Sequence, residues 1–138
     1  MRATALKTKD EAIAGARIEA VSCAVDLSKL SRRDRVATVC DGVIDITSAL
    51  FNVSGRDVRQ PGRSTLDISR VRQIGMYVAH VTLGISMRDV GEGFGRDRTT
   101  VLYACHQIED LRDDAEFDSI VAMMERVVIA VFGRIDQD

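Results

Sequence analysis

Apolar residues recur at helical spacing along most of this chain of 138 residues. Even the Val- and Ile-rich run 36–46 follows a period of about 3.6 residues rather than the alternation of a half-buried strand. The pattern predicts helices at 9–30, 31–51, 65–83, 86–94, 97–111 and 116–132. We therefore expect an all-α protein of about six helices.

Capping residues and glycines mark the ends of these helices. Ser31 and Ser86 each stand three residues before an aspartate, which makes a partial capping box. Gly84, Gly95 and Gly133 follow predicted helices and end them. Between residues 52 and 64, Asn, Ser, two Gly and the only Pro predict a loop.

The predicted helices suggest one main domain and an N-terminal extension. The length allows one domain with a real core, which we assign to residues 31–134. Residues 1–8 and 135–138 are expected to be disordered tails. The helix at 9–30 is rich in small apolar residues. Its pattern does not distinguish packing on the domain from pairing with a second copy or another protein, so an oligomerisation role stays open.

Composition indicates a cytoplasmic protein. No apolar run approaches the length that spans a bilayer, and the polar residues 1–10 lack the apolar core of a signal peptide. Cys23, Cys40 and Cys105 are odd in number and show no CxxC spacing. We expect them to be reduced and to serve as small core residues rather than as metal ligands or disulfides.

Charge is distributed unevenly, although the net charge is only −2. Residues 1–55 carry a net charge of +1, residues 56–106 carry +3 and residues 107–138 carry −6. All 8 cations of the middle block are arginine, the side chain best suited to bidentate contact with phosphate and guanine. Local charge sets the footprint on a nucleic acid, so this block is the candidate surface.

A very short interhelical connection lies in the same block. One predicted helix ends at Gly95 and the next begins at Asp97 or Arg98, so the two must cross steeply, as in a helix-turn-helix. The second helix opens with cationic and hydroxyl side chains, which contact phosphates and base edges in a DNA major groove. We interpret the chain as a binder of double-stranded DNA. Its candidate major-groove residues are Arg96, Asp97, Arg98, Thr99, Thr100 and Tyr103.

Individual roles follow from side-chain chemistry. Asp97 either caps the helix by holding the amides of Thr99 and Thr100, or accepts a hydrogen bond from a cytosine amino group. Arg98 and its neighbour Arg96 are expected to reach guanine or phosphate. Tyr103 should point away from the apolar stripe of its helix and contact a phosphate or a base.

A second group of arginines is assigned to phosphate or minor-groove contact: Arg59, Arg63, Arg70, Arg72 and Arg88. Those in the predicted loop 52–64, together with Arg56, are either solvated or form an arm along the DNA backbone or in a minor groove. Arg70 and Arg72 stand in the first turns of a helix, where positive charge opposes the helix dipole. A phosphate or a nearby acid must offset that cost.

No catalytic constellation appears in the sequence. There is neither a Walker A motif nor a GxSxG motif. His80 and His106 sit singly in predicted helices and are interpreted as partly exposed helix residues rather than as ligands or bases. We therefore expect no enzymatic activity, no cofactor and no metal.

The run RQIGMYVAHVTLGISMRDVGEGFGRDRTTVLYACHQIEDL, residues 72–111, resembles the C-terminal DNA-binding domain of the bacterial replication initiator DnaA. That domain has an RQIAMYLAR-like helix and a GRDHTTVLHAC signature, and a weaker similarity extends from about 33 to 128. The resemblance implies an all-helical, Trp-repressor-like helix-turn-helix domain. It also implies that the signature reads a major groove and that a basic loop before the RQ helix enters a minor groove.

The signature carries over residue by residue. Asp97, Thr99 and Thr100 match it, whereas Arg98 replaces its His and Tyr103 replaces its later His. One Gly of the usual FGGRD turn is missing. In the basic-loop region, which holds Arg59 and Arg63, the sequence 66–67 is Leu-Asp where the family is often basic.

Three functions fit these observations. We favour a nucleoid-associated, sequence-specific transcriptional regulator. A replication modulator that competes for origin sites and a protein-binding adaptor with a vestigial DNA surface are the alternatives, the last favoured by the acidic C-terminal block and the small-residue helix 9–30. Because no ATPase motif is present, we expect that the chain is not a complete initiator.

Overall fold

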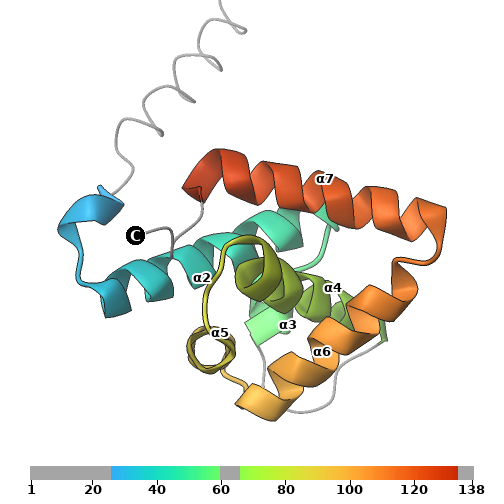
Figure 1. The fold of residues 1–138 in the computed structure, drawn as a ribbon, viewed down its shortest axis with the longest axis horizontal. Coiled ribbons are helices and arrows are strands. Elements are labelled where there is room, and N and C mark those ends of the chain that lie inside the picture. The colour runs from blue at the N-terminus through green and yellow to red at the C-terminus, as the bar shows by residue number, and fades with distance from the viewer. Residues whose placement is uncertain (1–25, 60–65, 134–138) are drawn as a thin grey trace, which may run out of the picture. The chain divides into compact units, whose positions relative to one another are not determined.

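Helices account for most of the residues that the computed structural model describes, which are 26–59 and 66–133 (Figure 1). In chain order they are the 3-10 helix η1 (Leu27–Lys29), α2 (Arg32–Leu50), α3 (Gly55–Arg59), α4 (Leu66–Tyr77), the π-helical η2 (Val78–Thr82), α5 (Met87–Phe94), α6 (Arg98–Leu111) and α7 (Ala115–Phe132). No strand occurs within the described ranges. The predicted all-α class is therefore confirmed.

The chain divides into two units, residues 1–30 and 31–138. Of the first unit, the structure describes a short turn in which the Asp26 side chain accepts a hydrogen bond from the Ser28 amide at 3.1 Å. Leu30 has an extended backbone. The predicted helix 9–30 therefore does not run unbroken to its expected end. Residues 9–25, for which an oligomerisation role was left open, lie outside the described residues, as do both predicted tails.

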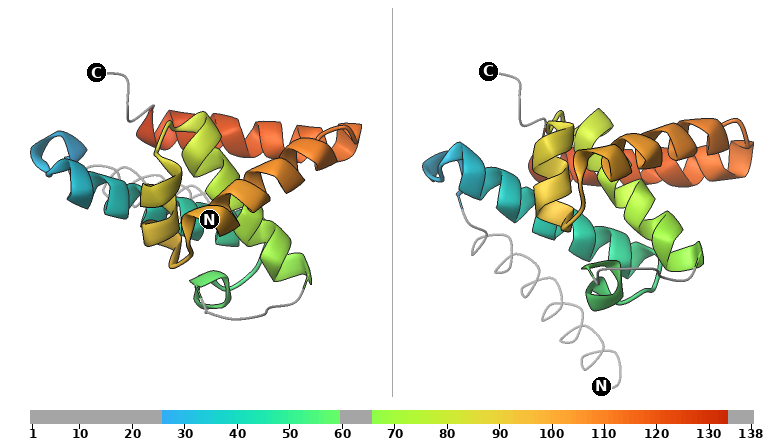
Figure 2. Two further views of the ribbon diagram at one scale, coloured as in Figure 1. Left: turned by 60° about the horizontal axis from the view of Figure 1, so that its bottom comes forward. Right: turned by 90° about the horizontal axis from the view of Figure 1, so that it is seen from below.

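The core of the second unit is built around α2. Ser31 caps this helix, because its hydroxyl accepts a hydrogen bond from the Asp34 amide at 3.2 Å. The inward face of α2 is wholly buried and follows the predicted apolar stripe, with Val39, Cys40, Val43 and Ile44. Helix α5 packs on its first half, α3 and α4 pack on its second half, and α6 lies on α4 and α5 (Figure 2). Full burial of each such aliphatic side chain contributes about 1.5–3 kcal/mol relative to exposure.

Helix α3 lies inside the segment that was predicted to be a loop, so this part of the prediction is wrong. The Ser54 hydroxyl accepts a hydrogen bond from the Arg56 amide at 3.2 Å at the start of the helix. Val58 then anchors the helix, because its side chain is fully buried. The loop prediction came from the Asn, Ser, Gly and Pro content of the whole segment, but α3 begins at the first of its glycines, Gly55.

The predicted helix 65–83 forms as two parts. Helix α4 occupies its first part, and the last turn widens into the π-helical η2. The Leu83 amide donates to the Val78 carbonyl at 3.0 Å, five residues back. Such single π turns occur frequently at functional sites, and this one directly precedes α5.

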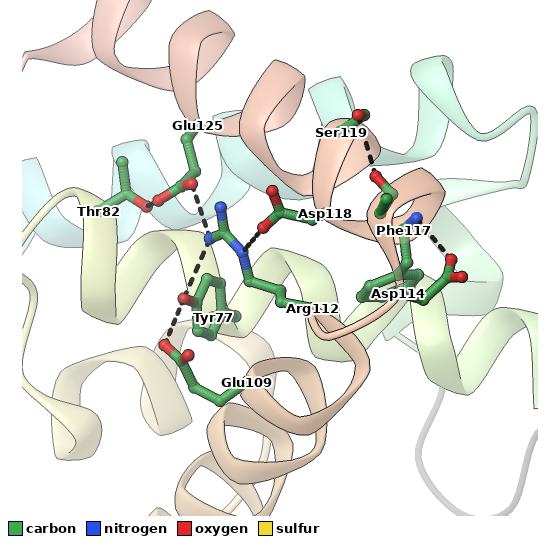
Figure 3. A network of polar contacts seen from close by, with 10 residues as sticks. Tyr77, Thr82, Glu109, Arg112, Asp114, Phe117, Asp118, Ser119 and Glu125 are labelled. Carbon is green, nitrogen blue, oxygen red and sulfur yellow. Dashed lines mark hydrogen bonds and ion pairs between the residues drawn. The ribbon is translucent and has the colours of Figure 1, made fainter.

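A network of polar side chains joins the C-terminal end of α6 to α4, η2 and α7 (Figure 3). The Arg112 guanidinium donates to Asp118 at 2.6 Å, to Glu125 at 2.8 Å and to the Tyr77 hydroxyl at 3.2 Å. Tyr77 in turn donates to Glu109 at 2.6 Å. Since side-chain networks of this kind are strongest when every member is satisfied, Arg112 should be sensitive to replacement.

None of the helices in the described ranges is long and apolar enough to cross a membrane.

Arg112→Met is expected to lower the free energy of unfolding by about 3 kcal/mol, because removing one partner leaves half-buried carboxylates uncompensated. Urea denaturation measures this change. Arg126→Met, which removes an exposed arginine from the same helix that supplies Asp118 and Glu125, should stay within about 0.5 kcal/mol of the parent. Equal losses in the two variants would contradict a structural role for the network.

Stability is expected to fall at alkaline pH. Burial and the hydrogen bond to Glu109 raise the pKa of Tyr77 from 10.0 to about 12. Because the folded-state pKa lies above the unfolded value, the stability contributed by Tyr77 is complete below pH 10 and is lost as the pH rises toward 12. Burial likewise raises the pKa of Cys40 to about 12.

Urea denaturation at a series of pH values should therefore show a decreasing free energy of unfolding over this window. Tyr77→Phe is expected to remove part of the slope and to leave the part that arises from the buried thiols of Cys40 and Cys105. An identical pH dependence in the parent and in this variant would contradict the assignment.

Candidate nucleic-acid interface

Helices α5 and α6 form a helix-turn-helix with a very short connection. Helix α5 begins after Ser86, whose hydroxyl accepts a hydrogen bond from the Asp89 amide at 3.2 Å. It ends at Gly95, which adopts a left-handed conformation with φ of 66°. The amides of Gly95 and Arg96 donate to the carbonyls of Glu92 and Gly91 at 3.3 and 2.8 Å. This pair of bonds is the Schellman motif, which reverses the chain directly at the helix end.

The turn after α5 passes so close to the backbone of this helix that a glycine is required on the side of α5 that faces the turn. A Cβ atom on Gly91 would lie 2.6 Å from the carbonyl oxygen of Arg96, a backbone atom. Gly91 is buried, and the neighbouring side chains of Val90 and Phe94 are buried as well. The separation of the two helices is therefore fixed by contact between backbone and backbone.

Asp97 caps the amino end of α6. Its carboxylate accepts a hydrogen bond from the Thr100 amide at 2.7 Å. That bond, together with the Thr100 hydroxyl, lowers the pKa of the Asp97 carboxyl, so the cap is charged at neutral pH. Of its two predicted capping contacts, the one to Thr100 is confirmed.

The first turns of α6 present a polar surface outward. Arg98 and Thr99 are exposed, Thr100 is partly exposed, and Tyr103 is 57% exposed. The Tyr103 hydroxyl accepts a hydrogen bond from the Gln107 side chain at 2.9 Å, which holds the ring along the outer face. The opposite face is the buried apolar stripe of Val101, Ala104, Cys105 and Ile108. The predicted outward orientation of Tyr103 is thus confirmed.

Two further side chains share this outer face and were not selected from the sequence. Leu102 is 39% exposed and His106 is exposed. Leu102 could have been found from the sequence, because it does not belong to the repeating apolar stripe of its helix. A large apolar residue is thereby left on the polar side. An apolar side chain among polar ones is suited to contact a thymine methyl.

Arg88 and Arg98 line one cavity of about 550 Å³ together with His80, Ser86 and Met87. Arg88 comes from the first turn of α5 and is 83% exposed, with Glu92 one turn away at 3.9 Å. His80 comes from η2, where its ring nitrogen Nδ1 lies 2.6 Å from the Ile85 carbonyl oxygen. Two arginines and a hydroxyl around one hollow provide donors for an anionic oxygen.

The remaining candidate arginines, from both predicted groups, differ in accessibility. Arg70 is partly buried and donates to Gln73 at 2.8 Å. Arg96 is partly exposed and donates to the Gly95 carbonyl at 3.2 Å. Arg63 lies outside the described residues.

Arg72 departs from its predicted role. Its side chain is buried, with 6% exposed, and its guanidinium donates to the carbonyls of Val58 at 2.8 Å and Asp57 at 3.3 Å. Burial, with the nearby charge of Arg96, lowers the pKa of Arg72. The carbonyl groups of α3 therefore offset the unfavourable position of this positive charge in the first turns of α4. Arg72 connects α4 to α3 and does not face a phosphate.

Arg59 also departs from the prediction of a loop arm. It sits on α3, and its guanidinium lies 3.3 Å from the Asp45 carboxylate and 3.7 Å from that of Asp41, both on α2. Arg56 is the second residue of the same short helix and is exposed. Two carboxylates thus neutralise Arg59, which weakens its assignment to DNA.

The described cysteines behave as predicted core residues. Cys40 and Cys105 are buried and free, and burial raises the pKa of their thiols to about 12 and about 11. Cys23 lies outside the described residues. Within residues 26–59 and 66–133, no group of three or more His, Cys, Asp or Glu side chains is placed to hold a metal ion.

The fold and this site define a helix-turn-helix domain. The model of the bacterial DnaA protein helix-turn-helix family matches residues 40–108, half of the chain. The chain belongs to this family, which confirms the resemblance carried by the GRDRTTV signature.

Relatives extend the similarity slightly beyond the match. The chromosomal replication initiator protein DnaA of Crocosphaera subtropica is 42% identical over 71 residues, which cover 51% of this chain and 15% of that protein. The proteins of the same name from Trichormus variabilis and Mycobacteroides abscessus are 34% and 30% identical, over 56% and 62% of this chain. The chain spans less than a fifth of the length of these relatives, with 17% and 18% covered in the latter two.

Gly91→Ala is expected to destabilise the domain by about 1–3 kcal/mol, because the new methyl group would displace the backbone of the turn. Thermal unfolding and urea denaturation measure the loss. Ala37→Gly on the exposed side of α2 serves as the control, because it exchanges the same two residue types in a helix without a steric clash. It should lower the free energy of unfolding by only about 0.5–1 kcal/mol. A Gly91→Ala protein as stable as the parent would show that the turn yields easily.

Proposed function

We propose that this chain binds double-stranded DNA in a sequence-specific manner, with the amino end of α6 in the major groove. The observation that carries the proposal is the outward-facing start of α6. Arg98, Thr99 and Tyr103 are exposed there, while Asp97 fixes the first turn. A helix end with these side chains matches the way recognition helices approach base edges.

Phosphate contacts would position that helix. The cavity lined by Arg88, Arg98 and Ser86 lies beside the amino ends of both helices of the motif. A phosphate oxygen fits this chemistry because guanidinium groups donate charge-assisted hydrogen bonds. Arg88 is therefore assigned to backbone contact, and Arg98 to base contact with a share in the cavity.

We further propose that the biological role is transcriptional regulation and that the protein is neither an enzyme nor dependent on a cofactor. The exposed surface of α6 is proposed to act by binding alone: the protein would regulate a promoter by occupying a DNA site there. Such a role implies association with the nucleoid.

A second candidate role is modulation of replication through competition for origin sites. The relatives named chromosomal replication initiator protein favour it, as do the signature residues shared at Asp97, Thr99 and Thr100. Selection of bound fragments from random duplexes separates the two roles. The affinity of the protein for an origin fragment and for a promoter fragment that each contain the selected sequence can then be measured by titration and compared.

Arg98→Ala is expected to cost about 1–3 kcal/mol of binding free energy on the selected site and to relax specificity, since it removes a base contact. Arg88→Ala should weaken binding to selected and random duplexes by equal factors, because a phosphate contact carries no sequence information. Fluorescence anisotropy on both duplexes measures the affinities. Arg126→Ala, which removes an exposed arginine of α7, serves as the matched control and should leave both affinities unchanged.

An equal loss on both duplexes for Arg98→Ala would overturn its assignment to a base contact. If the parent binds no duplex, or binds with an affinity that does not change between about 50 and 200 mM salt, the DNA proposal itself fails, because phosphate contact requires counterion release. The adaptor with a vestigial DNA surface would then be preferred.

A further inference from the structure

A second arginine-lined cavity, of about 690 Å³, lies between the start of α2 and α5. Arg32 and Arg33 line it from the first turn of α2, and Arg88 lines it from α5. Both α2 arginines are exposed. Three arginines from two helices thus line one hollow, which joins the start of α2 to the first helix of the helix-turn-helix.

Arg88 also lines the cavity that contains Arg98, so the two hollows meet at one side chain. Helix α5 lies between the start of α2 and the start of α6 in all views (Figures 1 and 2). The order across the surface is therefore the α2 pair, then Arg88, then Arg98. The α2 pair and Arg88 are therefore suited to neighbouring phosphates of one DNA strand, next to the base contact assigned to Arg98.

We propose that Arg32 and Arg33 bind one or two backbone phosphates of the same duplex, beyond the phosphates contacted at the helix-turn-helix. This inference rests on the proposed DNA-binding function. It adds a contact that the family match does not cover, because that match begins at residue 40.

The cavity between α2 and α5 keeps a small surplus of positive charge. Asp89 and Glu92 line it against three arginines, which leaves a surplus of one positive charge. Glu92 lies one turn from Arg88 at 3.9 Å, so part of this charge is already balanced. The lining arginines outnumber the lining acids, as contact with an anionic DNA phosphate requires.

The spacing between the α2 pair and Arg88 is held by close helix packing. A Cβ atom on Gly93 would lie 2.6 Å from the Cys40 sulfur, so α2 and α5 touch with almost no intervening side chain. Val36, one turn after the arginine pair, is buried. The pair is therefore carried on a rigid element, which lowers the entropic cost of ordering the contact on binding.

The test compares Arg32→Ala/Arg33→Ala with the parent on the selected site. The slope of log affinity against log salt should become shallower by roughly one to two, at about 0.9 per phosphate contact. The ratio of affinities at 50 and 200 mM salt should then shrink by roughly 3- to 12-fold. Arg126→Ala should keep the slope of the parent.

Trimming the duplex gives a second readout. Removal of base pairs from one flank should weaken the parent, and the double variant should be insensitive to the same trimming. Arg32→Lys/Arg33→Lys retains both charges and should retain most of the salt slope, which separates loss of charge from loss of structure. Thermal unfolding of the three variants should match that of the parent.

An unchanged salt slope with unchanged sensitivity to trimming would overturn the inference while leaving the proposed function intact. Absence of salt-dependent binding in the parent would instead remove both. A lysine variant that loses the slope as completely as the alanine variant, with normal stability, would also count against phosphate binding by charge.

Discussion

The backbone contact between α5 and the turn that follows it is the constraint on which the interface depends. Gly91 lets the carbonyl of Arg96 approach to a distance that no side chain allows, and Gly95 reverses the chain at that point. The start of α6 therefore lies close to the backbone of α5, with no side chain between them at this point. Every outward residue of α6, from Arg98 to Tyr103, takes its position from this contact.

The opposite end of α6 is fixed by charge rather than by close packing. Arg112, directly after the helix, connects Tyr77 to Asp118 and Glu125, so α6 is attached to α4 and α7 at once (Figure 3). Contact at one end and a hydrogen-bonded network at the other leave little freedom for rotation of the helix. An exposed binding surface can therefore be displayed on a helix that is itself rigid, as precise recognition requires.

Local signals made the helix-turn-helix predictable, whereas long-range partners decided the rest. The caps at Ser86 and Asp97 and the stop at Gly95 act within a few residues, so the sequence reveals them. Arg72 and Arg59 cannot be distinguished from exposed arginines by sequence, because their partners lie 14 or more residues away on α3 and α2. Helix α3 likewise depends on burial of Val58 by the rest of the fold, which local propensity does not contain.

Because Cys40 is buried where α2 contacts α5, the reactivity of its thiol reports the separation of these two helices. A thiol attacks alkylating reagents and oxidants as the thiolate, and a pKa of about 12 keeps Cys40 protonated under ordinary conditions. Its alkylation then proceeds only through states in which α5 has moved away. The labelling rate of this one sulfur thus follows the local unfolding that separates α2 from α5.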